Sequence, residues 1–165
     1  MATATLSAII EAPAERIRGV LLSAPLLPEW NPAFVRVEGP ARAAAGTDYQ
    51  LQVIRGLRGT LTYTHVDSEE ITMSWRVSGL SETGQWQLSP HPTRHQTRVT
   101  HTVERHGALA VVLGHALGTL PRLRLERLAE RAAAPQPADS PFPHRRSTGI
   151  TGHQRSGSAG TETTS

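Results

Sequence analysis

The sequence predicts an α+β protein in which an antiparallel sheet of about six to seven strands curls around one long C-terminal helix. Three observations lead to this prediction. Apolar and polar residues alternate with a period of two in several stretches before Gly107, which is typical of strands with one buried face. The links between these stretches are too short for parallel crossovers, so they join antiparallel neighbours. After Gly107, leucines recur at helical spacing.

The first elements follow the order strand, helix, bend. A strand is expected over about residues 3–11, and a helix over 14–22 begins directly after a proline, where that residue is tolerated. Pro28 and Pro32 then flank Trp30. Because proline fixes φ and lacks a backbone donor, this segment cannot continue a regular helix or form a central strand. It is therefore predicted to be a bend that carries a large side chain.

Further strands follow the bend. A short strand, FVRVE, precedes five longer alternating stretches. One set of alternate positions is mostly apolar and is expected to face the interior, while the other set is rich in Thr, Ser, Gln and Arg and faces solvent. The interior set comprises Tyr49, Leu51, Val53, Leu61, Tyr63, Ile71, Met73, Trp75, Val77, Trp86, Leu88, Val99, His101 and Val103.

The last folded element is predicted to be one long helix over about residues 108–132, bent near its middle by Pro121. Beyond it, residues 134–165 are dominated by Pro, Ser, Thr and Gly, and they offer too little apolar area to offset the entropy cost of ordering. We therefore expect a folded domain at residues 1–133 and a disordered tail at residues 134–165.

The composition limits the classes of function. All 17 basic residues are arginine, but they are dispersed and the net charge is only +3, so nucleic-acid binding is not expected. The absence of cysteine excludes disulfides, thiolate metal sites and a cysteine nucleophile. The histidines have no metal-site spacing, and neither a metal nor a cofactor is expected. No signal peptide or membrane span is recognisable, which indicates a soluble, cytoplasmic protein without integral membrane association.

The predicted architecture raises the question of what fills the interior. Seven strands span roughly 30 Å, whereas one helix with its side chains is only about 10–12 Å wide. The sheet must curl around the helix. The chain has only seven aromatic residues, and one of them, Phe142, lies in the expected tail and cannot help to fill the space between sheet and helix. Either this space collapses onto Leu, Val and Ala, or a pocket remains, which is where small-molecule sites usually form.

Several short motifs in this order of elements resemble a known superfamily. The motifs are Ala12-Pro13, Trp30-Asn31-Pro32, Gly46, Trp75, Gly84 with Trp86 and Leu88, Thr97 to Thr102, and Gly107-Ala108-Leu109. They resemble the START/Bet v-type helix-grip superfamily, often called SRPBCC, and within it the polyketide cyclase/dehydrase and lipid-transport group. The resemblance implies a helix-grip fold whose cavity, beneath the long helix, binds hydrophobic ligands such as lipids, quinones or polyketides. It also implies that Trp30 lies at the cavity entrance, the alternative being a plug in the core.

Two inward-facing residues are candidates for acid–base chemistry. Burial lowers the pKa of an imidazole, so an inward His101 would be neutral at pH 7 and able to accept a proton or a hydrogen bond. Tyr63 offers a hydroxyl that needs a partner when buried. Both residues can equally be satisfied core groups. The full set of expected ligand-lining residues is Trp30, Phe34, Tyr49, Leu51, Val53, Leu61, Tyr63, Met73, Trp75, Trp86, Leu88, Val99, His101, Leu113 and Leu117.

The function expected from these features is the binding of a hydrophobic or aromatic small molecule in an internal cavity. One alternative is an enzyme of the polyketide cyclase, aromatase or dehydratase type that uses the same cavity. A second alternative is a protein-interaction module formed by the C-terminal helix and the tail. On that helix an arginine-bearing face, expected to be exposed, carries Arg122, Arg124, Arg127 and Arg131.

Overall fold

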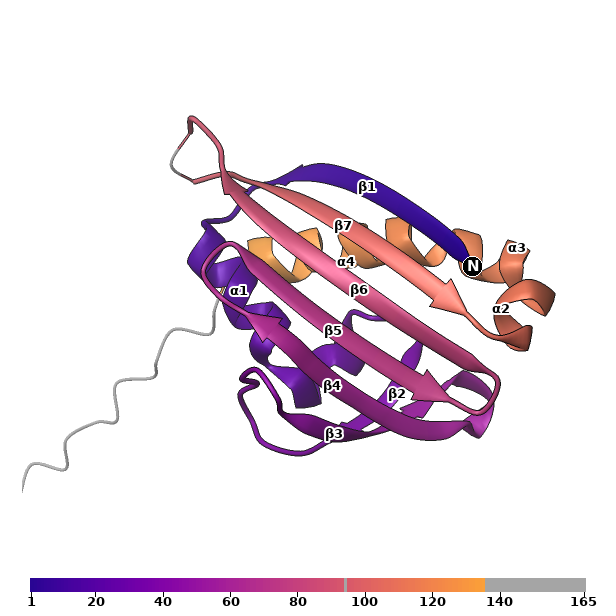
Figure 1. Ribbon diagram of the computed structural model, residues 1–165. Helices are drawn as coiled ribbons and strands as arrows, with labels where there is room; N and C mark the ends of the chain where they lie inside the picture. Colours follow the sequence, from indigo (N-terminus) through magenta and orange to yellow (C-terminus); the bar gives the residue numbers. More distant parts are fainter. Residues whose placement is uncertain (94, 136–165) are drawn as a thin grey trace, which may run out of the picture. The chain divides into compact units, whose positions relative to one another are not determined.

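One antiparallel sheet of seven strands forms most of the domain, in the order β1-β7-β6-β5-β4-β3-β2. The structure is a computed structural model that describes residues 1–93 and 95–135, and Met1–Ala134 form one compact unit. The first strand of the chain lies at one edge of the sheet beside the last (Figure 1). The strands are β1 (Ala2–Ile10), β2 (Phe34–Glu38), β3 (Asp48–Val53), β4 (Arg58–Val66), β5 (Glu70–Val77), β6 (Leu80–Pro90) and β7 (Thr97–His106).

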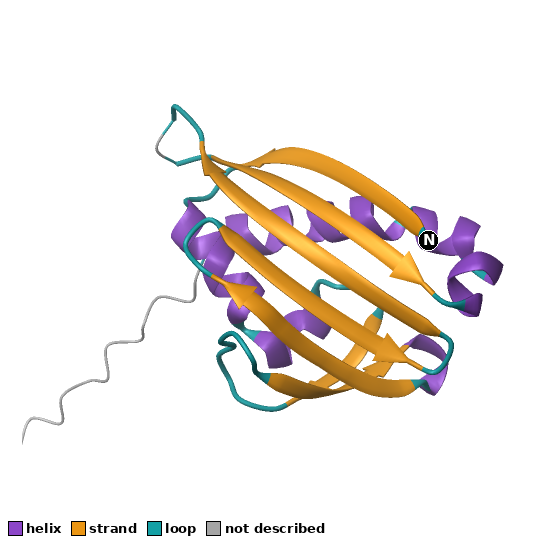
Figure 2. Ribbon diagram, in the orientation of Figure 1, coloured by secondary structure: helices purple, strands orange, loops and turns teal. Residues whose placement is uncertain are grey.

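The helices lie on one side of the sheet, as Figure 2 shows. No helix in the described part of the chain is long and apolar enough to cross a membrane. The helices are α1 (Ala14–Leu22), α2 (Ala108–Val112), α3 (Gly114–Gly118) and α4 (Leu120–Ala133), with short 3-10 helices η1 (Ala24–Glu29) and η2 (Ile54–Gly56). The α+β helix-grip fold predicted from the sequence is therefore confirmed, with α4 as its C-terminal helix.

The C-terminal helix differs from the prediction in one respect, because it consists of three pieces. Leu113, with φ −95° and ψ 8°, separates α2 from α3, and Thr119 separates α3 from α4. The prediction that Pro121 bends a continuous helix is wrong. Pro121 lies in the first turn of α4, where its missing N–H leaves no helical hydrogen bond unmade. Two glycines, at positions 114 and 118, further weaken the helix in this segment.

The proline-flanked bend contains more regular structure than expected. Residues Ala24–Glu29 form η1 with Pro28 inside it, and the backbone N–H of Trp30 donates to the oxygen of Leu27. The chain also leaves the sheet after β3, where Arg55 has a φ of 65° and is exposed. The expected tail at residues 134–165 falls almost wholly outside the described residues.

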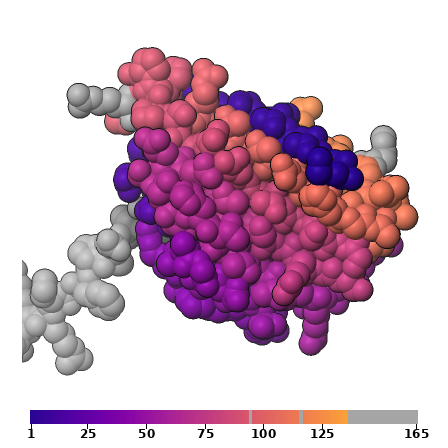
Figure 3. All heavy atoms as spheres, in the orientation of Figure 1, coloured from indigo at the N-terminus to yellow at the C-terminus, as the bar shows by residue number. Residues whose placement is uncertain are grey.

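The two faces of the sheet follow the alternation in the sequence. The predicted interior residues are buried, and all of them except His101 and Val103 belong to one hydrophobic core with side chains from α1, η1 and α4. The outer face carries pairs of hydroxyl side chains across neighbouring strands, such as Thr5 with Thr102 at 3.2 Å and Ser7 with Thr100 at 2.8 Å. Figure 3 shows this outer face as a continuous surface. A functional site is therefore to be sought on the inner face.

We expect substitution by alanine to destabilise the protein at Gly59 and to stabilise it at Gly19. An alanine Cβ at position 59 would lie 1.8 Å from the backbone oxygen of Arg76, so the pairing of β4 with β5 would have to shift. At Gly19, in α1, nothing lies within 4 Å, and alanine has the higher helix propensity. Gly59→Ala should lower the free energy of unfolding by ~2 kcal/mol or more, and Gly19→Ala should raise it by up to ~1 kcal/mol. Urea denaturation measures both; wild-type stability of Gly59→Ala would contradict the strand pairing.

Candidate functional site

A row of polar side chains crosses three neighbouring strands on the inner face. The strand register places Glu82 of β6 between Trp75 of β5 and Arg105 of β7. The carboxylate oxygen Oε1 of Glu82 accepts a hydrogen bond from Nε1 of Trp75 at 2.9 Å, and Oε2 accepts one from Nε of Arg105 at 2.6 Å. All three side chains are buried. The row thus consists of residues that are directly paired across neighbouring strands, so their side chains point to the same face of the sheet.

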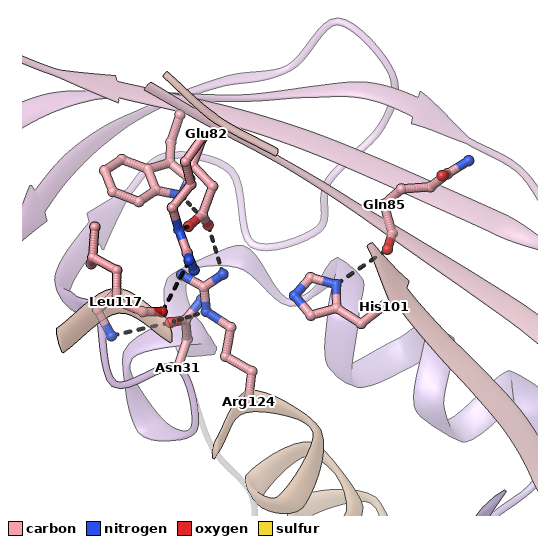
Figure 4. A network of polar contacts seen from close by, with 9 residues as sticks. Asn31, Glu82, Gln85, His101, Leu117 and Arg124 are labelled. Carbon is pink, nitrogen blue, oxygen red and sulfur yellow. Dashed lines mark hydrogen bonds and ion pairs between the residues drawn. The ribbon is translucent and has the colours of Figure 1, made fainter. Parts of the chain in front are cut away.

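Arg124 of α4 connects this row to the helices (Figure 4). Its Nη1 donates to Oε1 of Glu82 at 2.6 Å, and its Nε donates to Oδ1 of Asn31 at 3.1 Å. The same oxygen of Asn31 accepts the backbone N–H of Ala33 at 3.1 Å. Nη1 of Arg105 donates to the backbone oxygen of Leu117 in α3 at 2.9 Å. The network therefore joins the sheet, the bend after η1, α3 and α4.

The electrostatics of the network keep Glu82 ionised. Burial alone would raise the pKa of this carboxyl group, but the positive charges of Arg124 and Arg105, together with their hydrogen bonds, hold the pKa below its ordinary value. Only 2% of the side chains of Glu82 and Arg124 is exposed, so water screens these ion pairs little. The two arginines are needed to hold the carboxylate in its charged form.

A second row, which contains His101, lies two inward-facing positions further along the strands. The register pairs Trp86 of β6 with His101 of β7, and their rings stack with centroids 3.5 Å apart and planes 9° apart. Nδ1 of His101 lies 3.1 Å from the backbone oxygen of Gln85. Because a carbonyl oxygen only accepts, Nδ1 carries the proton and Nε2 is left as an acceptor. Nε2 has no hydrogen-bond partner among the described residues.

Burial, and after it the positive charge of Arg124, lowers the pKa of His101 from 6.5 to about 3, against a smaller opposing effect of the bond to Gln85. The ring is therefore neutral near pH 7. The role of His101 as a catalytic residue stays a prediction from the sequence.

A small cavity lies between the two rows, above Gly84, the inner position of β6 that has no side chain. Its volume is about 10 Å³, which is room for one water molecule. Figure 4 shows the ring of His101 pointing toward the guanidinium group of Arg124. The lining consists of Asn31, Phe34, Met73, Trp75, Glu82, Gly84, Trp86, His101 and Arg124.

The cavity is much smaller than the sequence led us to expect. The expectation assumed that the few aromatic residues of the domain could not fill the space beneath the helix. The structure shows why this was wrong: the long side chains of Arg105 and Arg124 enter the space from the sheet and from α4, and the carboxylate of Glu82 meets them there. Charged side chains thus fill part of the interior, whereas the prediction considered only apolar side chains for this space.

Five of the predicted lining residues do surround the cavity, namely Phe34, Met73, Trp75, Trp86 and His101. The other predicted residues pack in the surrounding core, with Leu113 only partly buried. These are Trp30, Tyr49, Leu51, Val53, Leu61, Tyr63, Leu88, Val99, Leu113 and Leu117.

Trp30 is both a core residue and the wall of a surface groove. Its side chain is buried and packs edge-on against Trp86, with ring centroids 5.8 Å apart. The same residue borders a groove of about 340 Å³ between η1 and α4, across which Glu29 and Arg131 form an ion pair at 2.7 Å. The bend therefore presents Trp30 to the core and Asn31 to the polar network.

Tyr63, the second candidate for acid–base chemistry, has its hydroxyl group occupied. The hydroxyl donates to the backbone oxygen of Leu21 in α1 at 2.7 Å. Burial, and then the neighbouring Tyr49, raises the pKa of Tyr63 above its ordinary value. The ring contacts Tyr49 edge-on at 5.8 Å. These contacts hold α1 against the sheet and leave this hydroxyl group as a structural donor.

Sequence reasoning missed four residues of the polar network, although signals for them were present. Glu82 has the same parity as Trp86, and Arg105 has the same parity as His101, so extending the alternation would have placed both side chains inside. Arg124 was expected on an exposed face, which is wrong, because it lies four residues from Leu120 and from Leu128 on the buried stripe. The fourth residue, Asn31, was noted only as part of a motif.

We expect Glu82→Gln to destabilise the protein strongly. The change keeps the shape of the side chain but leaves two buried guanidinium groups without a counter-charge, a situation that costs about 3–5 kcal/mol. Urea denaturation should show a loss of this size. The control is Glu104→Gln, which makes the same chemical change at an exposed position of β7 and should alter stability by less than ~0.5 kcal/mol. Equal effects of the two substitutions would refute the buried network.

We expect acid to destabilise the protein through His101 at pH values where carboxylates are still ionised. The pKa is about 3 in the folded protein and 6.5 in the reference state, so the unfolded chain binds more protons between these values. The free energy of unfolding should therefore fall as pH decreases from 6.5, by up to about 1.4 kcal/mol per unit from this residue. Urea denaturation at pH values between 6.5 and 5 measures this dependence, and His101→Gln should flatten it; an equally steep dependence in His101→Gln would contradict the assignment to this residue.

Comparisons with known proteins agree with this fold. Among solved structures, the chain is similar to truncated norcoclaurine synthase from Thalictrum flavum, with 14% identity, 82% of this chain and 95% of that chain covered, and a TM-score of 0.64. A protein from Chromobacterium violaceum shows 20% identity over 81% of this chain and 98% of its own, with a TM-score of 0.62. A hypothetical protein from Helicobacter pylori shows 11% identity over 79% and 88%, with a TM-score of 0.64. Identities this low establish a shared fold alone.

No curated protein matches the chain. The model of one family, described as polyketide cyclase / dehydrase and lipid transport, matches residues 1–133. This match spans every strand and helix of the domain. The SRPBCC resemblance inferred from the sequence is thereby confirmed, and the chain belongs to the polyketide cyclase/dehydrase and lipid-transport family.

Proposed function

We propose that the protein binds an apolar or aromatic small molecule between the inner face of the sheet and α4. The observation that carries this proposal is the composition of the enclosed cavity. Phe34, Met73, Trp75 and Trp86 supply apolar and aromatic surface, and Nε2 of His101 is a buried acceptor that no described residue satisfies. Apolar surface with a few convergent polar groups is the usual composition of a small-molecule site. The family to which the chain belongs supports the same function.

Binding requires the cavity to enlarge, since its present volume holds one water molecule. We infer that α2 and α3 supply the opening. Val111 and Val112 of α2 are largely exposed, so this segment has little apolar contact to lose. Leu117 of α3 lies over the polar row, where its backbone oxygen accepts a hydrogen bond from Arg105. In contrast, α4 is held in place by the buried Arg124.

The same contacts favour ligand binding over acid–base catalysis of the cyclase type. A histidine whose pKa is lowered to about 3 is a weak base near pH 7, because its protonated form is strongly disfavoured. The hydroxyl group of Tyr63 is engaged by α1. Arg124, one of the four arginines of the expected docking face, is buried, which also weakens the case for a protein-interaction surface on this helix.

We expect the fluorescent neutral probe N-phenyl-α-naphthylamine to bind in one saturable site and to quench the tryptophans that line the cavity. Gly84→Val should weaken this binding by roughly tenfold, because a side chain at this position projects into the cavity, where a Cβ would already lie 3.3 Å from Cε1 of His101. Fluorescence titration measures both affinities. The Gly19→Ala variant, altered at a position with open space, should bind the probe like wild type.

Hydrogen–deuterium exchange tests where the probe enters. Amides of α2 and α3 should exchange faster than those of α4 in the free protein, and they should slow when the probe binds. Loss of saturable binding in the wild-type protein would contradict the proposed function. Saturable binding that Gly84→Val leaves unchanged would place the probe elsewhere on the protein.

A further inference from the structure

The charges buried in the interior do not balance. Among residues 1–93, 95–114 and 117–135, the charged side chains in the buried class are Glu82, Arg105 and Arg124. His101 is neutral, so these groups sum to one positive charge. An uncompensated charge in a protein interior is costly unless something pairs with it. The imbalance therefore requires either a high cost in stability or a negative partner.

Unused hydrogen-bond donors accompany this positive charge. Nη2 of Arg124 and Nη2 of Arg105 are buried, and neither has a hydrogen-bond partner in the described part of the chain. Arg124 also lines the cavity, whereas its Nε and Nη1 are already bound to Asn31 and Glu82. Two of the three guanidinium nitrogens are thus committed to the network, and the third, Nη2, has no partner among the described residues. A guanidinium group in this state is a ready binding site for an oxyanion.

We propose that the ligand carries an anionic oxygen group, such as a carboxylate, which Nη2 of Arg124 binds in the space above Gly84. The inference rests on the proposed function and adds the charge of the ligand to it. The apolar part of the molecule lies among Phe34, Trp75 and the other aromatic residues of the cavity wall. Nε2 of His101, which accepts, takes a hydroxyl group of the ligand or a water molecule.

A single water molecule does not explain these features as well. Water can accept from Arg124 and donate to His101, and the cavity has room for it. It cannot, however, neutralise the surplus charge of Glu82, Arg105 and Arg124. An anion does both: it accepts a hydrogen bond from Nη2 of Arg124 and balances the surplus positive charge. The orientation of a ligand follows directly: its acidic end faces α4 and its apolar body faces the aromatic side chains of β5 and β6.

Two probes of nearly the same shape, one anionic and one neutral, test this proposal on the full chain. β-Naphthoate and methyl β-naphthyl ketone have the same rings and the same carbonyl group, and a methyl group of the ketone replaces the charged oxygen. Isothermal titration near neutral pH should show that β-naphthoate binds roughly tenfold tighter or better. Raising sodium chloride from about 0.05 M to about 0.5 M should leave most of this preference, because screening acts weakly on buried pairs.

Variants of α4 test whether Arg124 causes the preference for β-naphthoate over the neutral ketone. Arg124→Gln should reduce the affinity ratio of the two probes to about one, and Arg124→Lys should restore part of it. Arg122→Gln removes the same charge from an exposed position of the same helix and should leave the ratio unchanged. Circular dichroism of each variant verifies that it folds. If Arg124→Gln does not fold, the wild-type ratio and its salt dependence still decide the proposal.

The outcomes separate this inference from the proposed function. Saturable binding of both probes with equal affinity would overturn the anionic ligand and leave the binding function in place. A preference that salt abolishes, or that Arg122→Gln reduces as much as Arg124→Gln, would place the anion on the surface and also overturn the inference. Binding of neither probe would overturn both.

Discussion

The carboxylate of Glu82 is the interaction on which the interior of this protein depends. It receives hydrogen bonds from Trp75, Arg105 and Arg124, which belong to three elements far apart in the sequence. A buried ion pair of this kind contributes little net stability compared with apolar packing, yet it strongly penalises arrangements that break it. A slip of one residue between β6 and either neighbour would turn partners to opposite faces. The carboxylate therefore fixes the strand register and the rotation of α4 at the same time.

This arrangement also explains which parts of the structure could be predicted. Alternation identified the inner face correctly, because side-chain parity is a local property of a strand. The same rule also applies to Glu82 and Arg105, but the alternation was not extended to these two residues. Arg124 was placed on the outside for its charge, although its spacing from the leucines of the helix put it inside. The size of the cavity could not be predicted, since alternation gives the direction of a side chain and not how far it reaches.

The fold of this chain is shared with proteins of very different sequence. The three solved structures compared above have 11% to 20% identity with the chain and TM-scores of 0.62 to 0.64. A backbone of this kind tolerates many sets of inward residues, so the fold says little about the ligand. In this chain the informative residues are the charged and polar ones at the centre of the sheet. Gly84 is equally important, because it keeps space open between the row of Glu82 and the row of His101.

The position of β1 affects how the protein is made. This strand is synthesised before the other strands of the domain, but it pairs with β7. Ala2, for example, is the register partner of Arg105, which is separated from it by most of the sequence of the domain. Such distant pairing is slow to form, because the entropy of closing the intervening chain is lost before any contact rewards it. In the sheet, β7 lies between β1 and β6. During synthesis, β1 and one edge of β6 therefore stay unpaired until β7 has left the ribosome. The period of greatest exposure to edge-to-edge association is therefore the interval of synthesis, and a chaperone that shields strand edges would act there.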